Sequence, residues 1–246
     1  MSRKEVFKVG MSKLFSLPVL SLGLIAAASG QAASPGEPSL SYFGRSSVKI
    51  RTASGFVVYI DPYAPGDYSE PADLILVTHG HGDHNAVELP ARKKGCVVAA
   101  PKGAVDERGY RVLAEGMSLT EGPLTVRALP ASNRNHPRGE CLGYLLSFDK
   151  IVLYHAGDTS WLPEMESFAS FGIGYAMLPC DGYYNMGPEE AEKCAAAMRA
   201  KRVLPMHSSK DGNFGQKNAE ALAALATAAG AKGVVLKPGE KLALLP

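Results

Sequence analysis

The chain has 246 residues, of which 46% are hydrophobic and 20% are charged, and this composition excludes an intrinsically disordered protein. The formal net charge is +2, and its positive excess lies in the first 32 residues, where Arg3, Lys4, Lys8 and Lys13 outnumber Glu5. Because the rest of the chain carries no excess of basic residues, we expect no nucleic-acid partner.

The amino-terminal segment has the order of a secretory signal peptide. Basic residues precede the apolar run Leu14–Ala28, and small residues follow it to Ala32 and Ala33, where we expect cleavage. The run is shorter than the roughly 20 residues that cross a bilayer, although an uncleaved anchor is the alternative and Met11 is a second candidate start. We therefore expect a periplasmic or secreted protein, with a signal peptide over 1–32, a short linker over 33–40, one domain over 41–246 and no stable membrane insertion after cleavage.

Short β-rich runs fill most of the predicted domain. The continuous apolar run Asp73–Thr78 is typical of a buried strand. Leu142–Phe148 and Ile151–Ala156 flank the dipeptide Asp149-Lys150, so we expect them to pair as a hairpin. Further strands are predicted at Val48–Arg51, Phe56–Asp61, Cys96–Ala100, Leu124–Leu129, Ile173–Leu178 and Arg202–Met206.

Two helices are predicted near the carboxyl end. The first begins at Pro188, a favoured first-turn residue, and Glu189 and Glu190 follow where the helix dipole stabilises negative charge. The second runs from about Gln216 to Ala229 and ends at Gly230. The sequence contains no short repeat or long linker, which favours a single mixed α/β domain.

A cluster of histidines follows a predicted strand in the segment HGHGDH, which contains His79, His81, Asp83 and His84. Imidazole is the commonest ligand for metals such as zinc. Side chains two apart share a face of an extended segment, so His79 and His81 are expected to point the same way, while the intervening glycines let Asp83 and His84 reach a second metal. A structural or surface cluster is the alternative, but exposed imidazoles beside glycines contribute little to packing.

Three further candidate ligands lie in loops or at predicted strand ends. His136 precedes a predicted strand, Asp158 follows another in the triplet GDT, and His207 follows a third after Leu204-Pro205-Met206. Each alone is more often a solvated side chain, and their joint arrangement is what indicates a metal site. His155 is expected to point away from Asp158 and to be buried rather than to bind metal.

The succession HGHGDH, a single histidine, GDT and PMH resembles the metallo-β-lactamase superfamily, and more narrowly its metal-dependent hydrolase branch that includes L-ascorbate-6-phosphate lactonase. The resemblance extends from about Ser41 to Leu236. It implies an α/β (α+β) fold, a four-layer αββα sandwich of two mixed β-sheets flanked by helices, with a metal centre at one edge. The other matching segments are Ile60-Asp61-Pro62, Leu129–Asn133, Tyr154–Asp158, and Leu178-Pro179 with Met186 before a helix.

The resemblance also implies two divalent metal ions. Zinc is favoured by the imidazole-rich ligand set, and manganese, iron and nickel accept the same ligand types. The ions would activate water to attack an ester, lactone, amide or phosphoester of a small-molecule substrate, and Asp83 would also act catalytically by orienting the nucleophile or accepting its proton. The implied ligands are His79, His81 and His136 for one ion, Asp83, His84 and His207 for the other, and Asp158 between them, with support from Asp61 and Thr159.

The sequence departs from the family pattern in three ways. Arg45 stands where many relatives have a histidine, Cys180-Asp181 occupies a position that is usually small or apolar, and the long insertions of RNA-processing relatives are missing. A planar guanidinium suits an anionic substrate group, whereas a surface arginine and packing tyrosines are the alternatives. The candidates for the substrate pocket are Arg45, Cys180, Tyr183, Tyr184 and Asn185.

Two other functions are compatible with such a metal centre: a mononuclear iron enzyme of the sulfur dioxygenase type, and a non-catalytic metal-binding module. Diiron relatives typically carry an acidic residue where this chain has His81, which argues against that version of an iron enzyme. A non-catalytic module would be expected to lack ligands, and the set of candidates is complete.

The four cysteines, Cys96, Cys141, Cys180 and Cys194, allow three pairings in an oxidising compartment. Buried free thiols are the alternative. No pair has the CxxC spacing of a structural zinc site.

Overall fold

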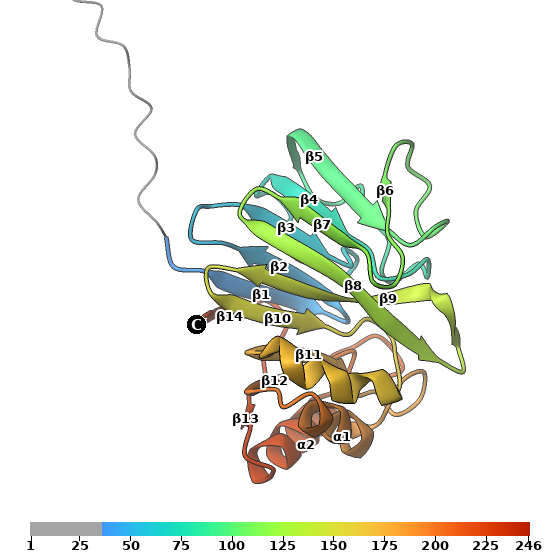
Figure 1. Cartoon of the computed structure of the whole chain (residues 1–246), viewed down its shortest axis with the longest axis vertical. Helices are drawn as coiled ribbons and strands as arrows, with labels where there is room; N and C mark the ends of the chain where they lie inside the picture. Colours follow the sequence, from blue (N-terminus) through green and yellow to red (C-terminus); the bar gives the residue numbers. More distant parts are fainter. Residues whose placement is uncertain (1–35) are drawn as a thin grey trace, which may run out of the picture. The chain divides into compact units, whose positions relative to one another are not determined.

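The computed structural model describes residues 36–246, and the predicted signal peptide lies outside the described residues. Two seven-stranded sheets make up most of the structure (Figure 1). The first sheet has the order β14-β1-β2-β3-β4-β5-β6, formed by β1 (Ser39–Gly44), β2 (Ser47–Arg51), β3 (Val57–Ile60), β4 (Ala72–Leu76), β5 (Arg92–Ala100), β6 (Arg111–Val112) and β14 (Lys241–Ala243). The second has the order β13-β12-β11-β10-β9-β8-β7, formed by β7 (Ser118–Glu121), β8 (Leu124–Asn133), β9 (His136–Phe148), β10 (Ile151–His155), β11 (Tyr175–Pro179), β12 (Arg202–Met206) and β13 (Lys232–Gly233).

Both sheets have the same pairing pattern. In the first sheet, the pairs from β14 to β3 are antiparallel and those from β3 to β6 are parallel. In the second, the pairs from β7 to β10 are antiparallel and those from β10 to β13 are parallel. Parallel strands place their carboxyl ends at a common edge, where α/β folds usually bind ligands. All the candidate ligands except His136 follow these strands.

The main core lies between the two sheets. Val58 and Ile60 of β3 contribute to this core, while Val57 and Tyr59 on the opposite face of the strand belong to a smaller outer cluster. Leu74 and Ile75 of β4 divide in the same way. Burial on both faces explains why these strands read as continuous apolar runs instead of alternating ones.

The helices cover the second sheet only. The helices α1 (Pro188–Ala197) and α2 (Gln216–Ala228) lie beside β11, β12 and β13 (Figure 1). The 3₁₀ helix η1 (Pro163–Phe171) contacts α1 and packs through Phe168 against Tyr154 of β10. Within residues 36–246, loops cover the outer face of the first sheet, and Ala64, Ala104 and Val105 from them pack against Tyr59 and Ile75. The predicted pair of mixed sheets with flanking helices is therefore confirmed, with a loop layer in place of one helical layer.

The predicted β9–β10 hairpin is present, with Phe148 paired to Ile151. Asp149 and Lys150 have φ of 46° and 62°, as a two-residue turn that follows the twist of the strands requires. Five strands and η1 are not predicted from the sequence: β1, which lies second in its sheet, and the edge strands β6, β7, β13 and β14, several of which are too short for a periodic pattern. β9 also begins at His136, before its apolar part.

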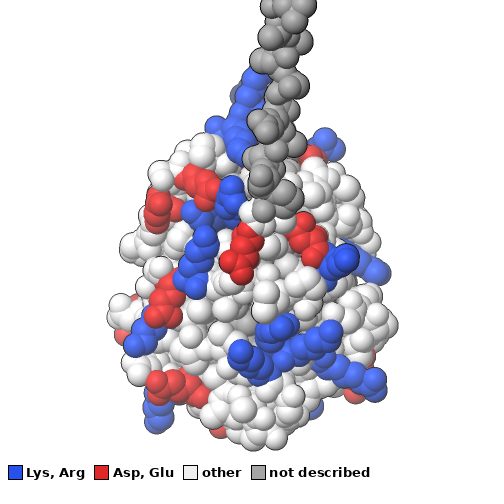
Figure 2. Space-filling view, turned by 90° about the vertical axis from the view of Figure 1, so that its left-hand side faces the viewer, with Lys and Arg blue, Asp and Glu red and all other residues white. Residues whose placement is uncertain are grey.

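All four cysteines are free thiols; Cys141, Cys180 and Cys194 are buried, and Cys96 is half-buried. Within residues 36–246, no helix has the length and apolar character needed to cross a membrane. Acidic and basic side chains are interspersed over the face shown in Figure 2, with one small group of basic side chains in its lower part.

Candidate metal centre

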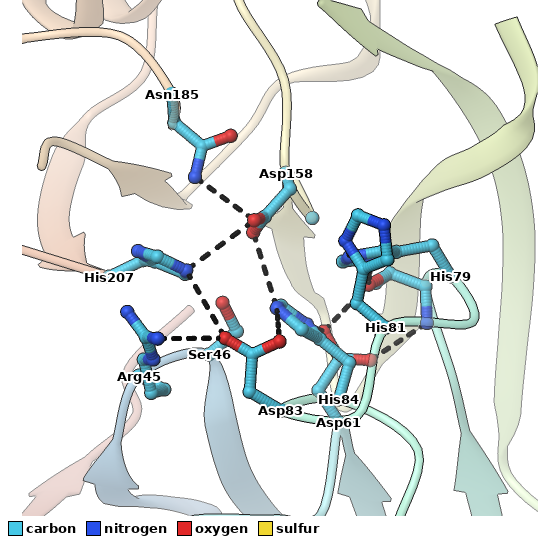
Figure 3. Close-up of polar contacts among 12 residues, drawn as sticks. Arg45, Ser46, Asp61, His79, His81, Asp83, His84, Asp158, Asn185 and His207 are labelled. Atoms are coloured by element: carbon cyan, nitrogen blue, oxygen red, sulfur yellow. Dashed lines mark hydrogen bonds and ion pairs between the residues drawn. The ribbon is translucent and has the colours of Figure 1, made fainter. Parts of the chain in front are cut away.

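The seven predicted ligands converge at the edge where the parallel strands end, and Figure 3 labels all of them except His136. His79, His81, Asp83 and His84 lie in the loop after β4. The other three follow β10 and β12 or begin β9, whose amino end lies at the same edge because β9 is antiparallel to β10; these are Asp158, His207 and His136. Residues more than 120 positions apart in the chain thus share one site.

One group of donors consists of His79, His81 and His136. Nδ1 of His81 lies 3.2 Å from Nε2 of His79 and 3.2 Å from Nε2 of His136. Donors bound to one tetrahedral zinc ion are about 3.3 Å apart, since each zinc–nitrogen bond is about 2.0–2.1 Å long. These three nitrogen atoms therefore have the spacing of ligands to one ion.

A second group consists of Asp83, His84 and His207, whose candidate ligand atoms lie within 4.8 Å of one another. Asp83 Oδ1 is 3.8 Å from His84 Nε2, and Asp83 Oδ2 is 3.8 Å from His207 Nε2. Arg45 also contacts this group, with Nη2 3.0 Å from Asp83 Oδ2.

Asp158 lies between the two groups. Its Oδ2 is 3.5 Å from His136 Nε2 and 3.4 Å from His207 Nε2, and its Oδ1 is 3.6 Å from His84 Nε2. Both Asp158 Oδ1 and His84 Nε2 are buried and have no hydrogen-bond partner. A buried polar atom without a partner costs about 1–3 kcal/mol. A cation bound at the centre would satisfy both atoms, so the donor set fits a metal centre.

Three of the imidazoles are hydrogen-bonded through Nδ1, and a fourth, His207, has its Nδ1 within ion-pair distance of a carboxylate, which leaves Nε2 of each ring directed at the centre. Such contacts fix the ring orientation and the tautomer that binds metal. The contacts of Nδ1 are His79 with Thr78 Oγ1 at 3.1 Å, His84 with Asp61 Oδ2 at 2.7 Å, His136 with Asn133 Oδ1 at 2.8 Å, and His207 with Asp181 Oδ2 at 3.0 Å.

Asp61 has the supporting position that the family resemblance implies. Besides its contact with His84, its carboxylate accepts hydrogen bonds from the backbone N–H and the hydroxyl of Thr78, each at 2.7 Å. Thr159 acts further from the ligands, since its hydroxyl accepts a hydrogen bond from the backbone N–H of Ser132. The contacts of Asn133 and Asp181 with the ligands are not predicted from the sequence, in which the available signal is a polar residue at or just after the end of a strand.

The charges of the site are strongly coupled. Burial, with a further contribution from His84, lowers the pKa of His79 to about 2, so its ring is neutral and able to bind metal. Burial would raise the pKa of Asp158, but His207 and His84 hold it well below its ordinary value. Burial would lower the pKa of His207, but Asp158, Asp181 and Asp83 raise it to about 10. A positive charge at the centre is therefore stabilised before any metal is bound.

A cavity of about 410 Å³ opens onto the donors. Arg45 and Tyr184, two of the predicted pocket residues, line it together with Asn135. Arg45 also donates a hydrogen bond to the backbone oxygen of Ser209, and Asn135 donates one to that of Tyr184. Hydrogen bonds to backbone oxygens therefore fix the side chains of both Arg45 and Asn135, which line the cavity.

The other pocket candidates lie elsewhere. Tyr183 lines a neighbouring cavity, and Asn185 is buried and donates a hydrogen bond to Asp158. The prediction that Cys180 lines the pocket is wrong: its side chain is buried, with the thiol directed at the backbone oxygen of Met206. His155 is fully buried, as expected, and its Nε2 lies 2.9 Å from the backbone oxygen of Ser46.

Comparisons with known proteins agree with this geometry. Residues 39–207 match the beta-lactamase superfamily domain. The chain is 33% identical over 208 residues to a UPF0173 metal-dependent hydrolase of Thermococcus kodakarensis, which covers 76% of this chain and 92% of that protein. It is 32% identical over 221 residues to a UPF0173 metal-dependent hydrolase of Thermus thermophilus, with coverage of 82% and 97%.

Among solved structures, the fold is similar to that of Igni18, a metallo hydrolase from Ignicoccus hospitalis. The TM-score is 0.69 at 24% identity, over 84% of this chain and 98% of that one, a likeness that shows the fold alone. The fold, the donor set and the sequence matches agree, and this chain belongs to the beta-lactamase superfamily and, within it, to the UPF0173 metal-dependent hydrolase family.

Proposed function

We propose that this protein is an exported hydrolase that uses two divalent metal ions, with zinc as the first choice, to cleave a small-molecule ester, lactone, amide or phosphoester. The observation that carries the proposal is the position of Asp158, whose two carboxylate oxygens face donors of both groups. Imidazole-rich sets favour zinc over magnesium or calcium. The relatives are named metal-dependent hydrolases, which supports the same conclusion.

Two ions bound in such a site supply a water nucleophile at neutral pH and polarise the bond to be cleaved. His79, His81 and His136 would hold one ion, Asp83, His84 and His207 the other, and Asp158 both. Both carboxylates line the cavity, and Asp83 is the more exposed of the two, at 24% against 4% for Asp158. Asp83 is placed to orient the nucleophile or to accept its proton.

The cavity suits a small substrate with an anionic group. Its volume of about 410 Å³ lies in the range of small-molecule pockets. Arg45 uses one terminal nitrogen for Asp83 and the other for Ser209, and each of these nitrogens keeps a second N–H. Tyr184, which also lines the cavity, is 42% exposed and offers an aromatic surface and a hydroxyl. A lactone that carries a phosphate or carboxylate is one substrate of this class.

The test of catalysis combines metal analysis with a substrate panel. The purified protein is expected to contain up to two metal ions per chain and to hydrolyse at least one of a lactone, a carboxylic ester, an amide and a phosphodiester. A chelator should abolish the activity and added zinc should restore it. Full activity in metal-free protein would contradict the proposal.

Export is supported by the order of basic, apolar and small residues before the domain. Fractionation of cells that express the full chain is expected to place a processed form in the periplasm or medium, with a new amino terminus near Ala32. Retention of the intact chain in the cytoplasm would contradict export while leaving the catalytic proposal untouched.

A further inference from the structure

The carboxylate of Asp181 is buried next to the candidate ligand His207 and contacts several hydrogen-bond donors. Its side chain is fully buried and contacts five donor atoms. Oδ1 accepts hydrogen bonds from the backbone N–H groups of Tyr183, Tyr184 and Asn185 at 2.6, 2.6 and 3.2 Å. Oδ2 accepts one from Asn185 Nδ2 at 2.9 Å and lies 3.0 Å from His207 Nδ1.

The two oxygens therefore have separate tasks. Oδ1 holds the backbone of the loop Asp181–Asn185 in a tight turn, whereas Oδ2 contacts the candidate metal ligand His207 and the side chain of Asn185. The same loop contacts a second candidate ligand besides His207. Asn185 Nδ2 donates a hydrogen bond to Asp158 Oδ2 at 3.0 Å (Figure 3). Asp158 and His207 are thus both connected to this loop through Asp181 and Asn185.

The loop also forms part of the substrate cavity. Tyr184 lines the cavity, and its backbone oxygen accepts hydrogen bonds from Asn135 at 2.8 Å and Asn133 at 3.2 Å. Asn133 in turn contacts His136, a donor of the other group. The side chains of Tyr183 and Tyr184 are 50% and 42% exposed, so they bury little apolar surface to hold the loop. Its order depends on these polar contacts.

We propose that Asp181 is a positioning residue that couples the donor group of Asp83, His84 and His207 to the loop Asp181–Asn185, so that metal binding at this group and order of the cavity wall stabilise each other. This inference rests on the proposed metal-dependent function. An imidazole that binds metal through Nε2 carries its proton on Nδ1 and donates it to the carboxylate behind it. That contact fixes the carboxylate, whose other oxygen holds the loop. Coupling of this kind is reciprocal.

Asp181→Asn separates the two tasks. An asparagine oxygen can still accept hydrogen bonds from the three backbone N–H groups, which hold the loop backbone. An amide nitrogen then faces His207 Nδ1 and Asn185 Nδ2, both of which need an acceptor. Asp181→Ala removes both tasks. Asp211→Asn is a matched control, because Asp211 similarly accepts hydrogen bonds from Asn213 N and Ser209 Oγ but is exposed and contacts no candidate ligand.

The experiment titrates metal-free full-length protein with Zn²⁺ by calorimetry and follows hydrogen exchange of residues 181–187 by mass spectrometry. In the wild type, exchange of this segment is expected to slow at the second equivalent of zinc and not at the first. Asp181→Asn should weaken the second binding event by about 10- to 100-fold, as for other residues that support metal ligands. Its exchange without zinc should match the wild type and should not slow when zinc is added.

Asp181→Ala should lose the second event and show fast exchange at every zinc concentration, while Asp211→Asn should behave as the wild type. Equal affinity of Asp181→Asn and wild type for the second ion would overturn the inference, as would slowing at the first equivalent. If wild-type protein binds no second ion, the proposed dinuclear function itself fails, so the two failures are distinguishable.

Discussion

Asp61 and His84 are both fully buried, and Oδ2 of the carboxylate lies 2.7 Å from Nδ1 of the imidazole. Asp61 follows β3 and His84 belongs to the loop after β4, the parallel neighbour of β3. The carboxylate also holds the backbone N–H and the hydroxyl of Thr78, the residue before His79. One side chain from a neighbouring strand end therefore orients both ends of the histidine-rich loop.

Asp61→Asn is expected to weaken metal binding by about 10- to 100-fold, because an amide in place of Oδ2 no longer orients His84 in the same way. Asparagine is the appropriate substitution, since Asp61 has a φ of 48°, which asparagine tolerates better than most residues. Competition between the protein and a zinc-binding dye measures the effect. Asp67→Asn, at an exposed aspartate that contacts only Ser69, is the control. Unchanged affinity in Asp61→Asn would show that this contact does not support the centre.

His79→Ala and His155→Ala distinguish a ligand from a buried histidine nearby. His79→Ala should lose one metal ion per chain and lower activity by at least about 100-fold, since its Nε2 is one of three donors to the first group. His155→Ala should keep both ions but unfold more easily, by about 1–3 kcal/mol, because the backbone oxygen of Ser46 loses its partner. Metal analysis and chemical denaturation of the same samples check both outcomes; a loss of metal in His155→Ala would contradict the assignment.

Removal of metal should lower thermal stability without loss of the two-sheet fold, whose core does not depend on the donors. A ligand present at 100 times its Kd contributes about 2.7 kcal/mol to the free energy of unfolding, or about 5–10 °C in melting temperature for a domain of this size. Scanning calorimetry with and without chelator measures this shift, and circular dichroism monitors the sheets. An identical melting temperature in both samples would argue against a bound metal.

Arg45→Met tests whether the guanidinium selects an anionic substrate. The Michaelis constant for an ester that carries a carboxylate is expected to rise about 10-fold or more, because a hydrogen bond to a charged group contributes about 1.5–3 kcal/mol. The value for a neutral ester of similar size should change little. Equal changes for both substrates would show that Arg45 acts through its ion pair with Asp83 and not on the substrate.

Tyr144→Phe tests the contact between the two sheets directly beneath the site. Tyr144 of β9 is fully buried, and its hydroxyl donates a 2.7 Å hydrogen bond to the backbone oxygen of Val77, which follows β4. The substitution leaves that oxygen without its partner and should reduce the free energy of unfolding by about 1–2 kcal/mol. Urea denaturation measures the change. Because no candidate ligand is altered, the stoichiometry of bound zinc should stay the same.

Much of the candidate site could be predicted from the sequence because its signals are local. The HGHGDH segment, the GDT triplet and His207 each stand at the end of an apolar run that reads as a strand. A strand followed at once by polar residues indicates both the element and the sheet edge at which those residues lie. The β9–β10 hairpin was predictable for the same reason, since its two strands and turn are contiguous.

The tertiary structure alone decided which partner each ligand has. The contacts of Asp181 with His207 and of Arg45 with Ser209 join residues that no pattern of spacing relates. The burial of Cys180 follows from the packing of β11 beside β12, which its place next to a charged residue concealed. Periodicity shows which face of a strand is apolar, but contact between two polar groups depends on how the strands align in space, and that alignment is a property of the packed sheets as a whole.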